Sequence, residues 1–218
     1  DATMIELTLI QKIAIFAIPV IFAITLHEAA HGYVALRFGD TTAKMLGRIT
    51  LNPLKHIDPI GTILVPALAL MLGGILFGWA KPVPVSFNNL RHPKQDMLWV
   101  AAAGPAANLV MAVFWAAVIK LAHLLPISTY TQPMILMGAA GITINAILAA
   151  LNLIPVPPLD GGRIAVSLLP RKLAYMLARV EPYGLFILVA LLFTGVLGSI
   201  IGPFYSLIER LAYSIFGL

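Results

Sequence analysis

The sequence contains no cysteine, and only 11% of its 218 residues are charged. Without cysteine there can be no disulfide and no thiolate ligand, so any metal must be bound by His, Asp or Glu. A soluble domain carries about 25% charged residues, whereas 60% of this chain is hydrophobic. No basic run with interleaved aromatics is present, so a nucleic-acid partner is not expected. The composition predicts an integral membrane protein in contact with the lipid bilayer, with one domain over residues 1–218.

Long uncharged stretches predict the membrane-spanning helices, because about 20 consecutive apolar residues cross a bilayer. Pro19 is expected to kink the first helix and Gly39 to end it, while Gly202-Pro203 should end the fourth. The expected fold class is an all-α polytopic membrane protein. Its four full spans lie at about 10–38, 97–119, 134–155 and 183–201, and a terminal helix covers 204–216.

Basic residues flank the uncharged stretch 59–80 on both sides and predict its topology. The positive-inside rule places such flanks in the cytoplasm. A single crossing would put them on opposite faces, so we expect 59–80 to be a re-entrant hairpin that Pro66 and Gly73-Gly74 interrupt. The N-terminus, which has no Lys or Arg before Lys12, is then expected outside. The flanking basic residues are Lys44, Arg48 and Lys55 before the stretch, and Lys81, Arg91 and Lys94 after it.

Two short segments are expected to be extended. Residues 42–52 mix polar and apolar side chains, and Ile49 and Thr50 favour a strand or loop there. Residues 81–87 contain Pro82 and Pro84, whose spacing is incompatible with a helix. The fold prediction therefore includes short β segments near the candidate active site.

The sequence Leu-His-Glu-Ala-Ala-His at residues 26–31 carries metal-ligand chemistry. His27 and His31 are four residues apart, which places both imidazoles on one face of a helix. Two neutral imidazoles so placed can bind one zinc ion, and Glu28 can take a proton from a water on the metal. Such residues are costly within a membrane span, which favours a functional role.

Asp160 is the candidate third ligand, because a catalytic zinc usually has three protein ligands. It lies at the end of the third predicted span that is expected to share the cytoplasmic face with His31. Taken alone, Leu159-Asp160-Gly161 is more typical of an ordinary turn or helix N-cap than of a metal ligand, so this alternative stays open.

Three motifs taken in order resemble the site-2 protease family, the intramembrane zinc metalloproteases. They are His27-Glu28-x-x-His31, Ala103-Gly104-Pro105, and Asn152-x-x-Pro155 followed by Leu159-Asp160-Gly161, and together they cover most of the chain. The chain resembles the short prokaryotic members, which lack a PDZ or regulatory domain.

The resemblance implies one Zn²⁺ per chain on His27, His31 and Asp160, with Glu28 as the catalytic base. It also implies that Asn152 helps to hold the substrate or the oxyanion. The substrates would be transmembrane segments of proteins, cleaved near the cytoplasmic face of a prokaryotic inner membrane. The sequence does not indicate an oligomeric state.

Two other functions are alternatives to a protease. An ion-coupled transporter should show matching motifs in two halves, but the chain has no second His-Glu-x-x-His. A zinc-binding membrane protein without catalysis is the other alternative. Among the remaining polar residues, His56 and Asp58 are expected to stabilise turns, Asn108 and Asn145 to join helices, and Arg163 to mark the inner face.

Overall fold

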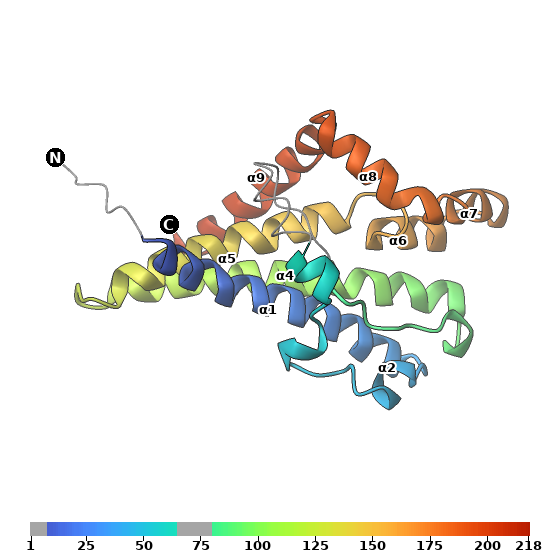
Figure 1. The fold of residues 1–218 in the computed structure, drawn as a ribbon, viewed down its shortest axis with the longest axis horizontal. Helices are drawn as coiled ribbons and strands as arrows, with labels where there is room; N and C mark the ends of the chain where they lie inside the picture. Colours follow the sequence, from blue (N-terminus) through green and yellow to red (C-terminus); the bar gives the residue numbers. More distant parts are fainter. Residues whose placement is uncertain (1–7, 65–79) are drawn as a thin grey trace. The chain divides into compact units, whose positions relative to one another are not determined.

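The computed structural model describes residues 8–64 and 80–218, and all regular elements in this part are helical (Figure 1). The α-helices are α1 (Leu9–Arg37), α2 (Thr42–Met45), α4 (Pro93–Leu124), α5 (Thr131–Asn152), α6 (Asp160–Leu168), α7 (Arg171–Ala178), α8 (Gly184–Phe193) and α9 (Val196–Phe216). Shorter turns are η1 (Pro53–Lys55), the π-helical η2 (Pro59–Leu64), η3 (Phe87–Asn89) and η4 (Glu181–Tyr183).

Four helical stretches are long and apolar enough to cross a membrane, as the sequence predicts. They are Ile13–Arg37, Pro93–Leu124, Thr131–Asn152 and Arg171–Phe193. Their most apolar windows bury only 28%, 39%, 44% and 11% of their residues inside the protein. Large apolar side chains such as Phe16, Phe22 and Phe114 are about half exposed. Apolar surface on this scale needs lipid around it, so the chain is an integral membrane protein.

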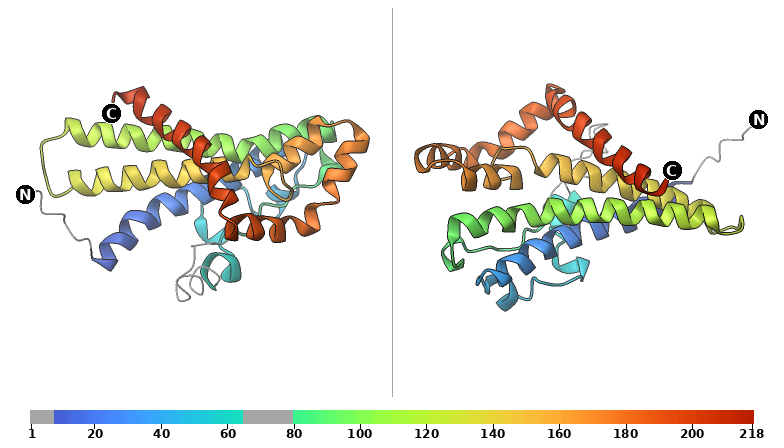
Figure 2. Two further views of the ribbon diagram at one scale, coloured as in Figure 1. Left: turned by 90° about the horizontal axis from the view of Figure 1, so that it is seen from above. Right: turned by 180° about the vertical axis from the view of Figure 1, so that it is seen from behind.

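The described residues form two compact units, and the first comprises 8–23, 108–151 and 188–218. Figure 2 shows the second half of α4 beside α5, joined by a short connection. Glycines make this approach close, since a Cβ at Gly141 would lie 2.2 Å from Trp115 Cγ. The Asn108 side chain donates to Ala23 O at 3.2 Å and to Asn145 Oδ1 at 2.9 Å. These bonds confirm the predicted role of both asparagines in joining helices.

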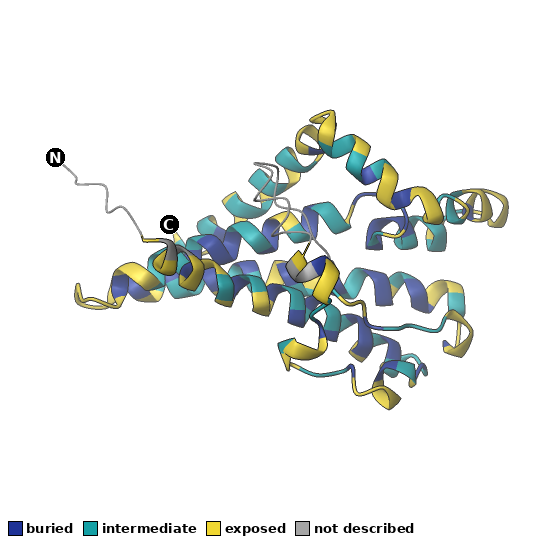
Figure 3. Cartoon of the chain, in the orientation of Figure 1, coloured by how far each residue is buried: buried dark blue, intermediate teal, exposed yellow. Residues whose placement is uncertain are grey.

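The second unit comprises 24–64, 80–107 and 152–187, and it holds all the candidate metal ligands. Its apolar core packs the second half of α1 against the first half of α4, through Ala35, Leu90, Met97 and Val100. The buried positions of both helices are dark in Figure 3, whereas α7 is largely exposed. In this unit α6 packs against α7.

The structure corrects two sequence predictions. No β-strand occurs in 8–64 or 80–218, and residues 42–45, expected to be a strand or loop, form helix α2. The break expected at Gly202-Pro203 lies instead at Gly195, whose φ of +74° is readily adopted only by glycine, and α9 continues through Pro203. The fourth span and the terminal helix are therefore divided earlier than predicted.

Two further sequence predictions concern the end of α1 and residues 59–80. α1 ends at Arg37, and Gly39, with φ +106°, follows it as the predicted stop. Residues 59–64 form a π-helical turn, but 65–79 lie outside the described residues, so the re-entrant hairpin stays a prediction. The single-domain prediction also stays a prediction.

Candidate functional site

His27 and His31 lie one turn apart on α1, as their spacing predicts, and both are buried. Their Nε2 atoms are 3.1 Å apart. The Nδ1 atom of His31 lies 2.7 Å from the carbonyl oxygen of Val100 on α4. Because a carbonyl only accepts, this Nδ1 carries the hydrogen, and the Nε2 lone pair is left facing His27. A hydrogen bond of this kind orients a metal-binding imidazole.

Asp160, the first residue of α6, brings a carboxylate to the same point. Its Oδ2 lies 3.2 Å from His27 Nε2 and 3.3 Å from His31 Nε2. Gly161 and Gly162 explain how α6 reaches this position. A Cβ on Gly161 would lie 2.3 Å from Leu153 O, and one on Gly162 would lie 2.2 Å from Pro157 N. The two glycines thus let the first turn of α6 rest directly on the preceding loop.

The three side chains suit a zinc ion in number, chemistry and spacing. All are at most 9% exposed. Zinc–nitrogen bonds of about 2.0–2.1 Å in a tetrahedral arrangement separate neighbouring ligand atoms by about 3.3–3.4 Å. The observed separations are 3.1, 3.2 and 3.3 Å. Asp160 Oδ2 is also buried, and it has no hydrogen-bond partner among the described residues. A cation would stabilise these converging donor atoms, so the group can hold one metal ion.

The backbone of α4 at Gly104 lies directly beside the two imidazoles. A Cβ at this position would lie 2.3 Å from His31 Nε2 and 2.5 Å from His27 Cε1. Any larger residue would therefore collide with both rings. The family-like motif Ala103-Gly104-Pro105 pointed to this residue, and the structure gives the steric reason for it.

The side chain of Glu28 is held by a backbone group far away in the sequence. Its Oε2 accepts the N–H of Val83 at 2.7 Å. Val83 belongs to residues 81–87, here called the 81–87 segment. Residues 81–86 are not helical, in keeping with their prolines, and the backbone of Ser86 is extended. Gly32, one turn beyond Glu28, lets this segment approach α1, since a Cβ there would lie 3.0 Å from Val83 Cγ1.

Two further side chains hold the 81–87 segment in place. Arg48 donates to Lys81 O at 2.8 Å. Asp40, which is completely buried, accepts the N–H of Ser86 at 2.6 Å. Asp40 also accepts hydrogen bonds from Thr42 and from the Asn89 side chain.

The ionised form of Asp40 is the favoured one. Burial alone would raise its pKa, but the hydrogen bonds from Thr42, Ser86 and Asn89 outweigh burial and hold the pKa below its ordinary value. Sequence reasoning missed Asp40. An aspartate just after a helix-ending Gly39 is typical of ordinary turns, and its distant partners leave no local pattern.

The other predicted polar residues lie at helix ends or in turns. Asn152 is the half-buried last residue of α5. Asp58 accepts the N–H groups of Ile60 and Gly61, and buried His56 contacts Thr50 O through Nε2 at 2.9 Å, so both stabilise turns as predicted. Arg163 pairs with Glu181 at 3.9 Å, so the prediction that it only marks the inner face was incomplete.

The known proteins to which the chain is similar are described as zinc metalloproteases. A protein-family model described as peptidase family M50 matches residues 127–195, which include Asn152 and Asp160. "Putative zinc metalloprotease YwhC" of Bacillus subtilis is 40% identical over 190 residues, covering 84% of this chain and 81% of that protein.

Two mycobacterial relatives share the name "Putative zinc metalloprotease Rip2". The Mycolicibacterium smegmatis protein is 34% identical over 180 residues, which cover 80% of this chain and 64% of the relative. The Mycobacterium tuberculosis protein is 31% identical over 193 residues, which cover 86% of this chain and 70% of the relative. No solved structure matches the chain.

Proposed function

This chain belongs to peptidase family M50 and is an intramembrane zinc metalloprotease, and we propose that it cleaves transmembrane segments of protein substrates with Glu28 as its base. The observation that carries the proposal is the convergence of His27 Nε2, His31 Nε2 and Asp160 Oδ2 within 3.3 Å of one another. Glu28 lies next to the first ligand on the same helix turn.

His27, His31 and Asp160 are the residues that would hold the zinc ion. When bound there, zinc lowers the pKa of a water molecule and polarises the peptide carbonyl. The Val100 carbonyl orients His31, and the lack of a side chain at Gly104 leaves room for both imidazoles. Burial of all three ligands keeps bulk water away from their donor atoms.

Glu28 would move the proton. The Val83 N–H fixes Oε2, which leaves Oε1 to accept a proton from the attacking water and later to deliver it to the leaving amine. A carboxylate held at one oxygen cannot rotate freely, so its other oxygen keeps a constant direction. Val83 thus contributes to catalysis through its backbone, by positioning Glu28.

A transmembrane substrate must unwind locally, because a helix hides its peptide bonds behind i→i−4 hydrogen bonds. The 81–87 segment can accept the unwound chain as an added strand. Pro82 and Pro84 have no N–H to offer, while the N–H and carbonyl of Val85 have no hydrogen bond in the described part of the chain. Residues 42–52 are the other segment predicted to be extended, but they begin with helix α2, so we favour 81–87. Asn152 is the proposed contact to the substrate or its oxyanion.

We place the N-terminus outside and the site near the cytoplasmic face, from the distribution of Lys and Arg. In that orientation substrates would be cut near their cytoplasmic ends. The bacterial relatives support an inner membrane of a prokaryotic cell as the location.

Glu28→Gln separates this proposal from the alternatives. Glutamine can still accept the Val83 N–H but cannot take a proton, so purified Glu28→Gln protein should keep its zinc and lose at least about 100-fold in cleavage of a designed transmembrane substrate. Glu209→Gln on α9 is the matched control and should cleave normally. Substantial cleavage by Glu28→Gln would exclude Glu28 as the base. Wild-type protein that binds zinc but cleaves no substrate would favour a non-catalytic role.

A further inference from the structure

The second unit contains a cavity that the proposed mechanism does not use. Its volume is about 410 Å³, within the range of about 300–1,000 Å³ typical of ligand sites. Val85 and Phe87 of the 81–87 segment line it together with residues of α6 and α7. Two residues before Val85, the same segment donates to Glu28. The cavity therefore adjoins the candidate active site along one continuous stretch of backbone.

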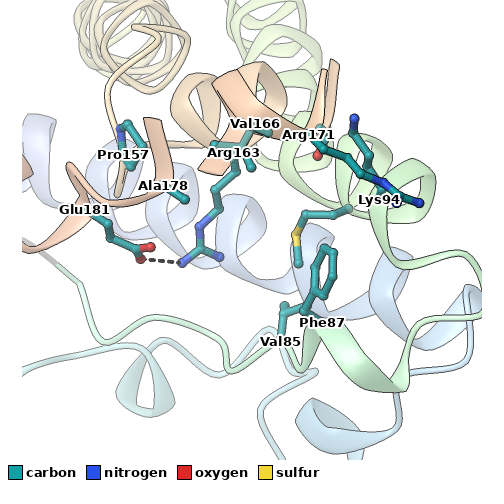
Figure 4. A pocket seen from close by; sticks show the side chains of 12 residues that line it. Val85, Phe87, Lys94, Pro157, Arg163, Val166, Arg171, Ala178 and Glu181 are labelled. Atoms are coloured by element: carbon teal, nitrogen blue, oxygen red, sulfur yellow. Dashed lines mark ion pairs between the residues drawn. The ribbon is translucent and has the colours of Figure 1, made fainter. Parts of the chain in front are cut away.

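The charges around the cavity are unequal. Three basic side chains line it, from Lys94, Arg163 and Arg171, against the single acidic side chain of Glu181. Arg163 pairs with Glu181, as the dashed line in Figure 4 shows. Lys94 donates to Leu169 O, but neither Lys94 nor Arg171 pairs with a carboxylate in 8–64 or 80–218. Lys94 and Arg171 are thus two basic groups of the cavity that could pair with an anionic group of a ligand.

Most of the remaining lining is apolar. Val85, Phe87 and Val166 are examples, and in Figure 4 Val85 and Phe87 lie together while Val166 lies apart from them. A ligand that fits must combine an apolar part with an anionic group. An acidic residue beside apolar residues in an unwound substrate has this chemistry, and so has an anionic phospholipid. Continuity with the segment that positions Glu28 favours the substrate.

We propose that this cavity is a specificity subsite of the protease, which binds an apolar stretch of the substrate followed by an aspartate or glutamate. The inference rests on the proposed function. Val85 and Phe87 lie two and four residues from Val83, which corresponds to at most about 7 and 13 Å along the chain. The apolar side chains of the substrate would therefore lie about two to four residues from the cleaved bond. The acidic residue would follow and meet Lys94 and Arg171.

Charge reversal tests the proposal with matched substrates. Purified full-length protein in neutral detergent is given designed transmembrane substrates that carry Glu, Gln or Lys at successive positions beyond the cleaved bond. The wild type should cleave the Glu substrate with a KM about fivefold lower than the Lys substrate at one or two of these positions. Arg171→Glu should invert this order, and Lys172→Glu, an exposed neighbour outside the cavity, should not.

The other outcomes would refute the subsite, and they can be told apart from a failure of the proposed protease function. Equal cleavage of all substrates, or an equal effect of Lys172→Glu, would mean that the cavity does not select the substrate. A loss in Arg171→Glu that is the same for every substrate, and that appears only in vesicles containing phosphatidylglycerol, would identify a lipid site instead. The absence of any cleavage would count against the protease function itself, since even the wild type would then be inactive. Zinc content and the helical circular dichroism signal of each variant show whether it has folded.

Discussion

Replacing Gly104 with alanine should remove zinc from the protein, because one methyl group cannot fit beside the two imidazoles. The new Cβ would lie 2.3 Å from His31 Nε2 and 2.6 Å from His27 Nε2. Non-bonded carbon and nitrogen atoms normally lie about 3.5–4.0 Å apart, so the rings or α4 must move by about 1 Å. Metal–ligand distances tolerate only about 0.2 Å. At least one zinc bond is therefore broken or badly distorted.

We expect the zinc affinity of Gly104→Ala to fall by at least about 100-fold, the upper end of what loss of a ligand-orienting group usually costs. Overpacking should also lower the stability by about 1–3 kcal/mol. Competition with a fluorescent zinc chelator measures the affinity on purified protein. Gly198→Ala in α9 is the control, since no atom of residues 8–64 or 80–218 lies within 4 Å of the added methyl, and it should bind zinc like the wild type. A Gly104→Ala protein with wild-type affinity and full proteolysis would refute the close approach of α4 to the site.

Two further predictions concern the segments around the site. Asp40→Asn should lower the stability by about 1–3 kcal/mol because its amide would oppose the Ser86 N–H, whereas Asp58→Asn should cost less. Since hydrogen bonds hold the pKa of Asp40 below its ordinary value, its contribution is complete above about pH 4 and is lost as the pH falls through the folded pKa. The unfolding midpoints of wild type and Asp40→Asn should therefore converge in acid, and a constant difference would contradict the role of the charge. For topology, single cysteines at positions 55 and 89 should both resist an impermeant thiol reagent in intact cells and react after lysis. Labelling of the cysteine at Asn89 from outside would exclude the hairpin.

The sequence predicted the candidate metal ligands, which the structure brings together, because local rules place most of them. The i, i+4 spacing of His27 and His31 gives one face of a helix whatever surrounds it. Asp160 required a further argument, namely that the first and third spans end at the same depth in the membrane. The family resemblance then distinguished a metal ligand from an ordinary turn. The spans themselves follow from composition, since about 20 uncharged residues leave few alternatives to a membrane helix.

The features that the sequence did not predict depend on contacts between distant residues. The bond from Val83 to Glu28 joins positions 55 residues apart, and the bond from Ser86 to Asp40 joins positions 46 apart. Residues 42–45 form a single helical turn although the neighbouring Ile49 and Thr50 favour strand, because local propensity is weak beside tertiary packing. The break at Gly195 and not at Gly202-Pro203 reflects the tolerance of long apolar helices for proline.

The claim on which the whole account depends is that His27, His31 and Asp160 hold one zinc ion. X-ray absorption spectroscopy at the zinc edge, combined with elemental analysis of the purified protein, measures both the stoichiometry and the ligand types. We predict one zinc per chain, two nitrogen ligands at about 2.0–2.1 Å with oxygen completing the coordination, and loss of most of the metal in Asp160→Ala. Zinc that remains at one per chain with an unchanged spectrum in Asp160→Ala would contradict the assignment.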